Sequence, residues 1–277
     1  MKDFKKEIKR ACKIGDFSRV NKSITLENLT EGIDTFGNTW MHEIAFAGHL
    51  QKLPPEFLTR KTVVELWNSD KQSPLSTAIS KNKSECIPWE VVEIDNMCQI
   101  NQYGMTPMIL AGLLAELHKI PQKYMTLKSV TKENNQRTNT LHAAAQNGQL
   151  HFIPRELLTK ENLVGGNLRP PLHIAVENGH IKLIPRELLT LELFSTKDHK
   201  GLTPLKYAEL KNTLPSPQEW LKLLRSEKKL QEFIDIETNS PNIIKSLREA
   251  LKLDKVLEQK RSKLSQAIYE IKTDVKL

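Results

Sequence analysis

Short blocks of apolar residues recur along this chain about 33 residues apart. The heptapeptide IPRELLT occurs twice without change, at residues 153–159 and 184–190. A second block precedes each copy and reads LHAAAQNG at 141–148 and LHIAVENG at 172–179, with a related version, MHEIAFAGH, at 41–49. Such self-similarity at a fixed period predicts a stack of repeated structural units.

One position in each block, which is histidine in three of them, fixes the register of the repeat. These register positions are His42, Ser76, Ile109, His142, His173 and Lys206, separated by 34, 33, 33, 31 and 33 residues. A proline lies twelve residues after each of the first five, at Pro54, Pro88, Pro121, Pro154 and Pro185. Because two independent markers agree in five units, the repeat is not a coincidence of composition.

Each unit carries the signals of two short helices. A serine or threonine followed by proline is typical of a helix start, because the hydroxyl caps free N–H groups and proline has no N–H to satisfy. Such pairs occur at Ser73-Pro74, Thr106-Pro107 and Thr203-Pro204. Glycine at 48, 148 or 179 ends the first helix in a left-handed conformation. We expect the second helix to be short and to begin at the proline, with an extra turn after it, as at 159–163.

The period and the Thr-Pro-Leu-His-like words resemble the ankyrin-repeat family, in a divergent form similar to microbial ankyrin-repeat proteins. The resemblance covers about residues 9–212 and implies an all-α, ankyrin-type helical-repeat solenoid with a C-terminal helical extension. We expect an N-terminal capping repeat at 1–33, about six ankyrin-like units at 34–213, the last incomplete, and a C-terminal helical cap or interaction segment at 214–277.

The two ends of the chain depart from the repeat. Near the N-terminus, Ala11, Phe17 and Val20 match core positions while lysines make the outer face polar, as a capping unit requires. A capping box at 216–219 and Ser240-Pro241 predict two C-terminal helices. A strict heptad in the second helix is interrupted by Asp254, Glu258 and Arg261. We therefore favour a hairpin folded onto the last repeat over a long coiled coil.

Composition places few limits on function. Apolar residues make up 39% and aromatic residues 6%, and the formal charge of +8 is spread along the chain as a solvated surface would be. No apolar stretch resembles a signal peptide or reaches the length of a membrane span. The cysteines Cys12, Cys86 and Cys98 form no paired motif. We expect a cytoplasmic or otherwise intracellular protein, in its own cell or delivered into a host cell.

Catalytic and metal-binding motifs are weak. His42 and His49 are seven residues apart, which is about 10 Å along a helix and too far to share one zinc ion. We interpret His42, His142 and His173 as structural, because they recur with the repeat. No phosphate-binding loop, nucleophile motif or carboxylate pair is apparent. We therefore expect no enzyme activity, no catalytic residues, no metal and no cofactor.

The resemblance implies a protein-binding scaffold, which serves as an inhibitor, an adaptor or an effector. Mapped onto this chain, the surface comprises Phe36, Trp40, Phe46, Gln102, Tyr103, Gln136, Arg137, Gln146, Asn147, Asn167, Arg169, Glu177, Asn178, His199 and Lys200. For Trp40 two interpretations are equally favoured: it lies on this contact surface, or it packs inward into the core. The alternative function is association with nucleic acid, if basic residues near 222–229 align with those at 252–260. The chain is expected to be a monomer or a dimer formed through its C-terminal helices.

Overall fold

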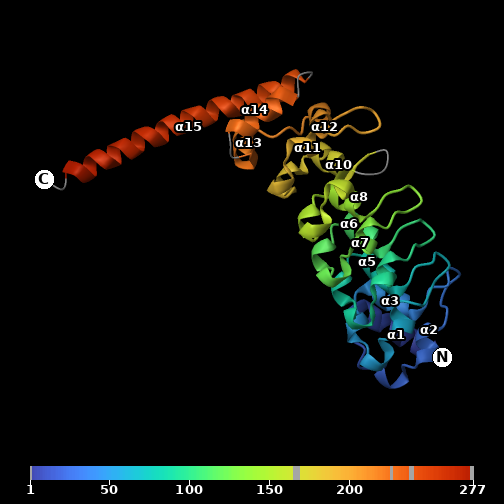
Figure 1. Ribbon diagram of the computed structural model, residues 1–277. Coiled ribbons are helices and arrows are strands. Elements are labelled where there is room, and N and C mark those ends of the chain that lie inside the picture. The colour runs from blue at the N-terminus through green and yellow to red at the C-terminus, as the bar shows by residue number, and fades with distance from the viewer. Residues whose placement is uncertain (1, 165–168, 225–226, 237–239, 275–277) are drawn as a thin grey trace. The chain divides into compact units, whose positions relative to one another are not determined.

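The computed structural model describes residues 2–164, 169–224, 227–236 and 240–274 (Figure 1). Its α-helices are α1 (Lys2–Ile14), α2 (Leu26–Thr30), α3 (Trp40–Ala47), α4 (Arg60–Val63), α5 (Pro74–Ser80), α6 (Pro107–Leu113), α7 (Leu127–Thr131), α8 (Thr140–Gln146), α9 (Lys160–Val164), α10 (Pro171–Glu177), α11 (Leu191–Phe194), α12 (Pro204–Lys211), α13 (Pro217–Leu224), α14 (Glu227–Ile236) and α15 (Pro241–Asp274). Within the described ranges there is no strand, and Gly32 and Thr39 form one isolated bridge. The all-α class is confirmed.

Two compact units divide the chain, 1–162 and 163–277. In the first unit, the first helices of successive repeats pack in order, with α3 on α5, α5 on α6 and α6 on α8. In the second unit, α10 packs on α12. The predicted repeat is thus present in both units, while the predicted domain boundaries remain a prediction.

The first helix of each repeat begins and ends as the sequence predicts. The hydroxyls of Ser73, Thr106 and Thr203 each accept a hydrogen bond from the backbone N–H three residues on. At the other end, Gly48, Gly148 and Gly179 have φ of +80°, +67° and +76°. These helices are short and are buried on most sides, so their stability comes from packing.

The predicted second helix is wrong in type. The segment holds two 3₁₀ turns, one before each repeat proline and one after it, as at Leu150–Phe152 and Arg155–Leu157. Four of the five prolines share nearly the same backbone geometry, with φ between −49° and −58° and ψ between 133° and 138°, while Pro88 has φ −76° and ψ 87°. Proline lacks the N–H that an α-helix would need at this point and disfavours helical geometry in the residue before it. Two separate turns satisfy both restrictions.

The expected extra turn is present after each proline segment. It forms α4, α7, α9 and α11 and the 3₁₀ helix Ile94–Cys98, and α2 is its counterpart nearer the N-terminus. Thr25, Thr59, Thr126 and Thr190 each accept a hydrogen bond from the backbone N–H three residues on, as helix N-caps do. These short turns bury Leu29, Val63, Val130, Leu163 and Leu193.

A stability prediction arises at Ala115, which occupies the glycine slot of the third unit. Its φ is +60°, a conformation that costs an L-residue about 1–2 kcal/mol, and its side chain is exposed. Ala115→Gly should therefore raise the free energy of unfolding by up to about 1 kcal/mol, after the extra backbone entropy of glycine is subtracted. Ala47→Gly, in the helical region of α3, should lower it. Chemical denaturation of both variants measures the difference, and destabilisation by Ala115→Gly would contradict the explanation.

The C-terminal helices of the second unit pack on its last repeat. The predicted capping box is confirmed, since Ser216 N–H donates to Glu219 Oε2 over 2.9 Å at the start of α13. Both α13 and α14 pack on α15, α14 also contacts α11, and α15 contacts α12. The rings of Phe194 and Phe233 lie 5.6 Å apart, and Asn242 N–H donates to Glu209 over 3.3 Å. The C-terminal hairpin therefore covers α11 and α12.

Candidate functional site

The loops before the first helices share one hydrogen-bonded design. An Asp or Asn side chain accepts from the backbone N–H groups two and four residues on, at Asp34, Asn68, Asn101, Asn134 and Asp198. A residue with positive φ lies three positions after each of them, such as Gly37 or Gly104. The same-side loops of the first unit are visible in Figure 1. Each loop is therefore held rigidly by its own side chain.

Successive loops in the first unit are linked by backbone hydrogen bonds. Ser69 N–H donates to Phe36 O over 2.8 Å, and Gln102 N–H donates to Asp70 O over 3.0 Å. The Asn68 amide also donates to Asn38 Oδ1 over 2.8 Å. These links align three loop tips into one continuous, pre-organised edge.

An open groove lies between the first two of these loops and the helices that follow them, α3 and α5. Its lining residues are Phe36, Asn38, His42, Glu43, Phe46, Asn68, Asp70, Gln72, Thr77, Ser80 and Lys81. Phe36 is 61% exposed and Phe46 is 51% exposed. Lys81 Nζ lies 4.8 Å from the centre of the Phe46 ring. Two exposed rings beside polar groups form a surface suited to protein contacts.

Two polar groups give the groove chemical specificity. Thr77 is 7% exposed, and its hydroxyl has no hydrogen-bond partner among the described residues. The Asp70 carboxylate accepts from the Gln102 amide, and from Tyr103 Oη over 3.2 Å. An orphan hydroxyl and a fixed carboxylate are both available to a ligand, and an unsatisfied buried group gains when a partner binds it.

The repeat histidines hold the loops to the helices. His42 Nε2 lies 3.0 Å from Gln72 O, and His173 Nε2 lies 3.1 Å from Leu202 O, in the next loop of each unit. His42 Nδ1 accepts from Thr39 N–H over 3.2 Å, and His142 Nδ1 lies 2.7 Å from Asn139 Oδ1. Burial lowers the pKa of His42, His142 and His173. All three are therefore neutral structural groups, as the sequence indicated.

One predicted contact residue in the first unit is wrong. Trp40 is 6% exposed and packs inward from the first turn of α3, so the inward-packing alternative is correct. Asn147 is exposed, but its amide donates to the carbonyls of Gly112 and Leu113, each over 3.1 Å. The other predicted residues of this unit are exposed: Phe36, Phe46, Gln102, Tyr103, Gln136, Arg137 and Gln146. Their role in binding remains a prediction.

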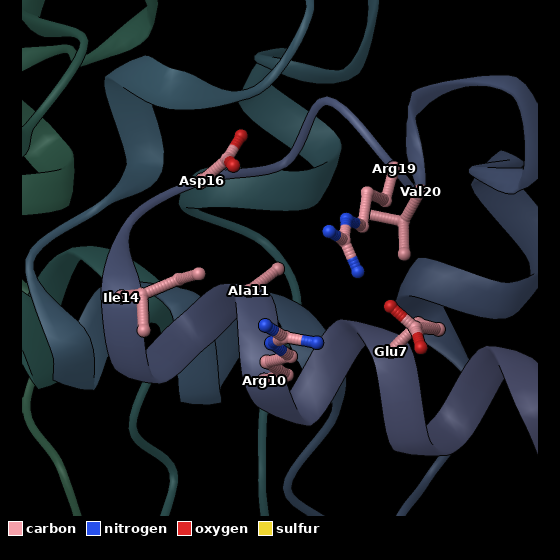
Figure 2. Close-up of a pocket in the computed structure, with 7 residues that line it drawn as sticks. All are labelled: Glu7, Arg10, Ala11, Ile14, Asp16, Arg19 and Val20. Atoms are coloured by element: carbon pink, nitrogen blue, oxygen red, sulfur yellow. The ribbon is translucent and has the colours of Figure 1, made fainter.

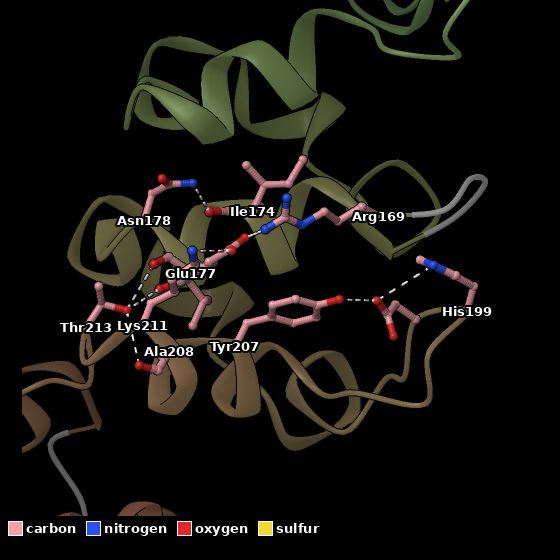
Figure 3. Close-up of polar contacts among 11 residues, drawn as sticks. Arg169, Ile174, Glu177, Asn178, His199, Tyr207, Ala208, Lys211 and Thr213 are labelled. Atoms are coloured by element: carbon pink, nitrogen blue, oxygen red, sulfur yellow. Dashed lines mark hydrogen bonds and ion pairs between the residues drawn. The ribbon is translucent and has the colours of Figure 1, made fainter.

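In the second unit, a network of polar contacts occupies much of the predicted surface (Figure 3). Glu177 is 8% exposed and forms ion pairs with Arg169 and, over 4.0 Å, with Lys211. Because it is buried against these cations, its assignment to the contact surface is wrong. Arg169 also lies 5.2 Å from the ring centre of Tyr207. The ion pair between Glu177 in α10 and Lys211 in α12 links these two helices.

The remaining candidates of the second unit differ in exposure and contacts. Asn178 is exposed, and its amide donates to Ile174 O over 2.8 Å. His199 and Lys200 are exposed at the loop that Asp198 holds. Partial burial opposes a low pKa for Asp198, but hydrogen bonds from Tyr207 and two backbone N–H groups hold it below its ordinary value. Asn167 lies outside the described residues.

Sequence reasoning missed several residues of the groove, although the register could have found them. Ser80 and Lys81 occupy the positions that Gln146 and Asn147 occupy in the fourth unit. Asp70 likewise occupies the loop-tip position of Phe36 and Tyr103. The sequence predicted no contact residue in the second unit, although the backbone of this unit keeps the same loop and helix.

A small surface pocket lies beside α1, in the segment predicted to be an N-terminal capping repeat (Figure 2). It is lined by Glu7, Arg10, Ala11, Ile14, Asp16, Arg19 and Val20. The Asp16 carboxylate accepts from Ser18 N–H over 3.0 Å, and this hydrogen bond lowers the Asp16 pKa. The pocket is small and one of its two acidic groups, Asp16, is already engaged, so it is a weaker candidate for a binding site than the groove.

Basic residues on the described surface are interspersed with acidic ones. Lys182 pairs with Glu219, Lys119 with Glu85 over 3.1 Å, and Lys228 with Glu232 over 3.9 Å. Arg225, which belonged to the alignment expected for nucleic-acid binding, lies outside the described residues. No helix in the described ranges is long and apolar enough to cross a membrane.

Comparisons with known proteins agree with this geometry. A family model described as ankyrin repeats, in three copies, matches residues 141–232. The fold is similar to the crystal structure of the ankyrin repeat domain of Bcl-3, described as a member of the IkappaB family, with a TM-score of 0.51, 16% identity, and coverage of 79% of this chain and 97% of that one. It is also similar to the human ASB11 ankyrin repeat domain, with a TM-score of 0.52, 15% identity, and coverage of 74% and 95%. No curated protein matches the chain.

Proposed function

We propose that this chain, which has the fold of an ankyrin repeat domain, works by binding a partner protein through the groove between its first two repeats. Ankyrin repeats are in general protein-interaction modules and non-catalytic scaffolds. The observation that carries the proposal is the pair of exposed rings, Phe36 and Phe46, beside a pre-organised loop edge. In this role the protein acts as an inhibitor, adaptor or effector without catalysis.

The groove supports recognition of a segment that presents one apolar side chain and nearby hydrogen-bond donors. The apolar side chain would pack on Phe36 and Phe46, and burial of such rings is a common source of binding free energy. The donors would meet the carboxylates of Glu43 and Asp70, which both line the groove. The Thr77 hydroxyl would gain its missing partner on binding. Because the loops are held by their own Asn and Asp side chains, little ordering is needed on association.

The test of this proposal uses one double variant and one matched control. The partner is first captured by crosslinking in the native or host cell, and then purified for titration against the full chain. Phe36→Ala with Phe46→Ala should weaken binding at least about 30-fold, equivalent to about 2 kcal/mol. Phe152→Ala removes a ring that is 38% exposed in a 3₁₀ turn, away from the groove lining, and should change affinity less than about twofold. Equal effects of the two changes would contradict the proposal.

We also propose an intracellular location, in the cell of origin or in a host. Cys12, Cys86 and Cys98 are all free and buried. Burial raises the pKa of Cys12 to about 12 and that of Cys86 to about 11, so both thiols stay protonated and unreactive. Three unpaired thiols suit a reducing compartment. Fractionation of cells that express the tagged full chain tests the location. Recovery of the protein only in the extracellular fraction would contradict it.

A further inference from the structure

Helix α15 carries a concentrated positive charge. Residues 245–263 hold seven basic and three acidic side chains, a net charge of +4, which is half of the formal charge of +8 of the whole chain. At about 100° per residue, five of the seven basic side chains fall within an arc of about 80° around the helix. We call this arc the basic stripe, and its residues, all exposed, are Lys245, Arg248, Lys252, Lys255 and Lys263.

The buried side of α15 lies opposite the basic stripe. Ile243, Leu247 and Ala250 are buried where α15 packs on α13 and α14, and their mean direction lies about 160° from that of the stripe. From residue 251 to 266 no side chain is buried, and Figure 1 shows this part of α15 extending beyond α13 and α14. The stripe is therefore open to solvent along its length, which is about 27 Å for eighteen residues at about 1.5 Å each.

The charges of the stripe are not neutralised by the described part of the chain. No ion pair among the described residues includes four of its members, Lys245, Arg248, Lys252 and Lys263. Asp254 and Glu258 lie more than about 100° from the middle of the stripe, and Glu249 lies beside it. Lysines elsewhere, such as Lys119 and Lys182, have acidic partners. The stripe is thus an exception to the interspersed charges of the remaining surface.

The composition of the stripe favours phosphate groups as its partner. Lysine and arginine side chains only donate hydrogen bonds, and phosphate oxygens accept them strongly. Protein interfaces are depleted in lysine and have an apolar centre, whereas the stripe is mostly lysine and has apolar residues, Ile244 and Val256, only at its edges. This composition therefore suits a nucleic acid, whose binding is dominated by contacts to phosphates, better than an acidic protein.

The position of the exposed apolar residues argues against a membrane surface. A helix that lies on a membrane turns its apolar face toward the lipid. In α15 the exposed side chains of Leu257 and Leu264 lie about 130–150° from the middle of the stripe, so lipid contact and charge contact would need opposite faces of the helix.

The straight form of the stripe favours a duplex over a single strand. A duplex as long as the stripe carries about 16 phosphate charges, one for about every 1.7 Å. Sites for single strands also use aromatic side chains on which bases stack, and residues 245–263 include no aromatic residue. Contacts to phosphates carry no sequence information directly.

We propose that the basic stripe of α15 binds the phosphate backbone of a nucleic-acid duplex without selecting its sequence. Three of its members, Lys245, Arg248 and Lys252, also line one surface hollow, where they surround the same space. The stripe shares no residue with the groove between the first two repeats, so each proposal can fail without the other.

Fluorescence anisotropy of the full chain with a labelled DNA duplex of mixed sequence, about 24 base pairs or three times the length of the stripe, tests the proposal. If three to five basic side chains contact phosphates, the logarithm of the binding constant should fall against the logarithm of the salt concentration with a slope of about −3 to −4.5. A triple change, Lys245→Gln with Arg248→Gln and Lys252→Gln, should weaken binding at least about 30-fold at about 50 mM salt and reduce the slope by about 2.7.

A matched variant separates the stripe from the overall charge. Lys22→Gln with Lys52→Gln and Lys61→Gln removes the same three charges from exposed positions of the first unit, and should change the affinity less than about threefold. Equal losses in the two triple variants would show attraction by net charge alone and overturn the proposal. Circular dichroism checks that both variants keep the helix content of the wild-type chain.

Competing probes identify the class of partner. An RNA duplex of the same length distinguishes the two sources of phosphate, and stripe-dependent binding of either duplex supports the proposal. A wild-type chain that binds neither duplex at about 50 mM salt would overturn it. Vesicles that contain phosphatidylserine, or poly-glutamate, would overturn it if they displaced the duplex at an equal concentration of negative charge. A single strand that binds more tightly than the duplex would contradict the assignment of a double helix.

Discussion

Truncation of the chain after Thr213 should give aggregated or poorly folded protein. The cut removes α13, α14 and α15 and exposes the faces of α11 and α12 that they cover. Trp220, Phe233 and Leu247 are at most 3% exposed in the intact chain, so the fragment loses a well-packed apolar layer. An open repeat face of this kind promotes association, which is why repeat arrays end in caps.

Two further variants make this prediction sharp. Trp220→Ala should lower the free energy of unfolding by about 3–5 kcal/mol, because the ring is buried and its N–H donates to Ser246 Oγ over 3.0 Å. Removal of the last residues from Thr273 should have no measurable effect. Size-exclusion chromatography with light scattering and thermal denaturation report both properties. If the fragment that ends at Thr213 is monomeric and as heat-stable as the full chain, the C-terminal helices are a separate interaction module.

The second large effect is expected at the repeat histidines. His42→Ala and His173→Ala should each lower the free energy of unfolding by about 1–3 kcal/mol, because each removes a buried imidazole and its hydrogen bond to a loop carbonyl, of Gln72 or Leu202. His151→Ala, at an exposed position, should change it by less than about 0.5 kcal/mol. Urea denaturation at pH 7.5 measures the three free energies. Zinc bound to the purified wild-type protein and lost in each histidine variant would refute the structural role.

The same histidines make stability depend on pH. Burial lowers the pKa of His42, His142 and His173 in the folded chain, so the unfolded chain binds more protons once the pH falls below about 6.5. The free energy of unfolding should therefore be constant above this pH and should fall as the pH decreases toward the lower, folded-state values. His142→Ala should reduce this slope. A free energy of unfolding of the wild-type chain that increases as the pH is lowered from 6.5 to 5 would contradict the assignment of neutral imidazoles.

The sequence predicted the repeat well because the relevant signals are local. Helix starts at Ser73, Thr106 and Thr203 depend on a hydroxyl that accepts a hydrogen bond from the backbone N–H three residues on, which the order of residues reveals directly. The 3₁₀ turns around the prolines were not predicted, since both helix types share the same start signals, although the restrictions that each proline imposes on its neighbours favour two short turns.

Prediction of the site was less complete because exposure depends on neighbouring units. Trp40 and Glu177 lie at positions where a helix face turns from solvent to core, and only the next helix decides which side they take. Ser80, Lys81 and Asp70 were missed although they occupy equivalent positions in the repeat, and their loop is held by Asn68 in the same way as the other loops. The second unit therefore keeps the backbone geometry of the loop although its register position is no longer histidine.

Hydrogen–deuterium exchange of the full chain with and without its purified partner tests the central proposal most directly, since it reports where amides become protected. Binding through the groove should slow exchange in the loops at 34–38 and 68–72 and in the neighbouring ends of α3 and α5. The 3₁₀ turns at 150–157 should be unaffected and serve as an internal reference. Protection confined to those turns, or to α15, with unchanged exchange at 34–38 and 68–72, would contradict the proposal that the groove binds the partner.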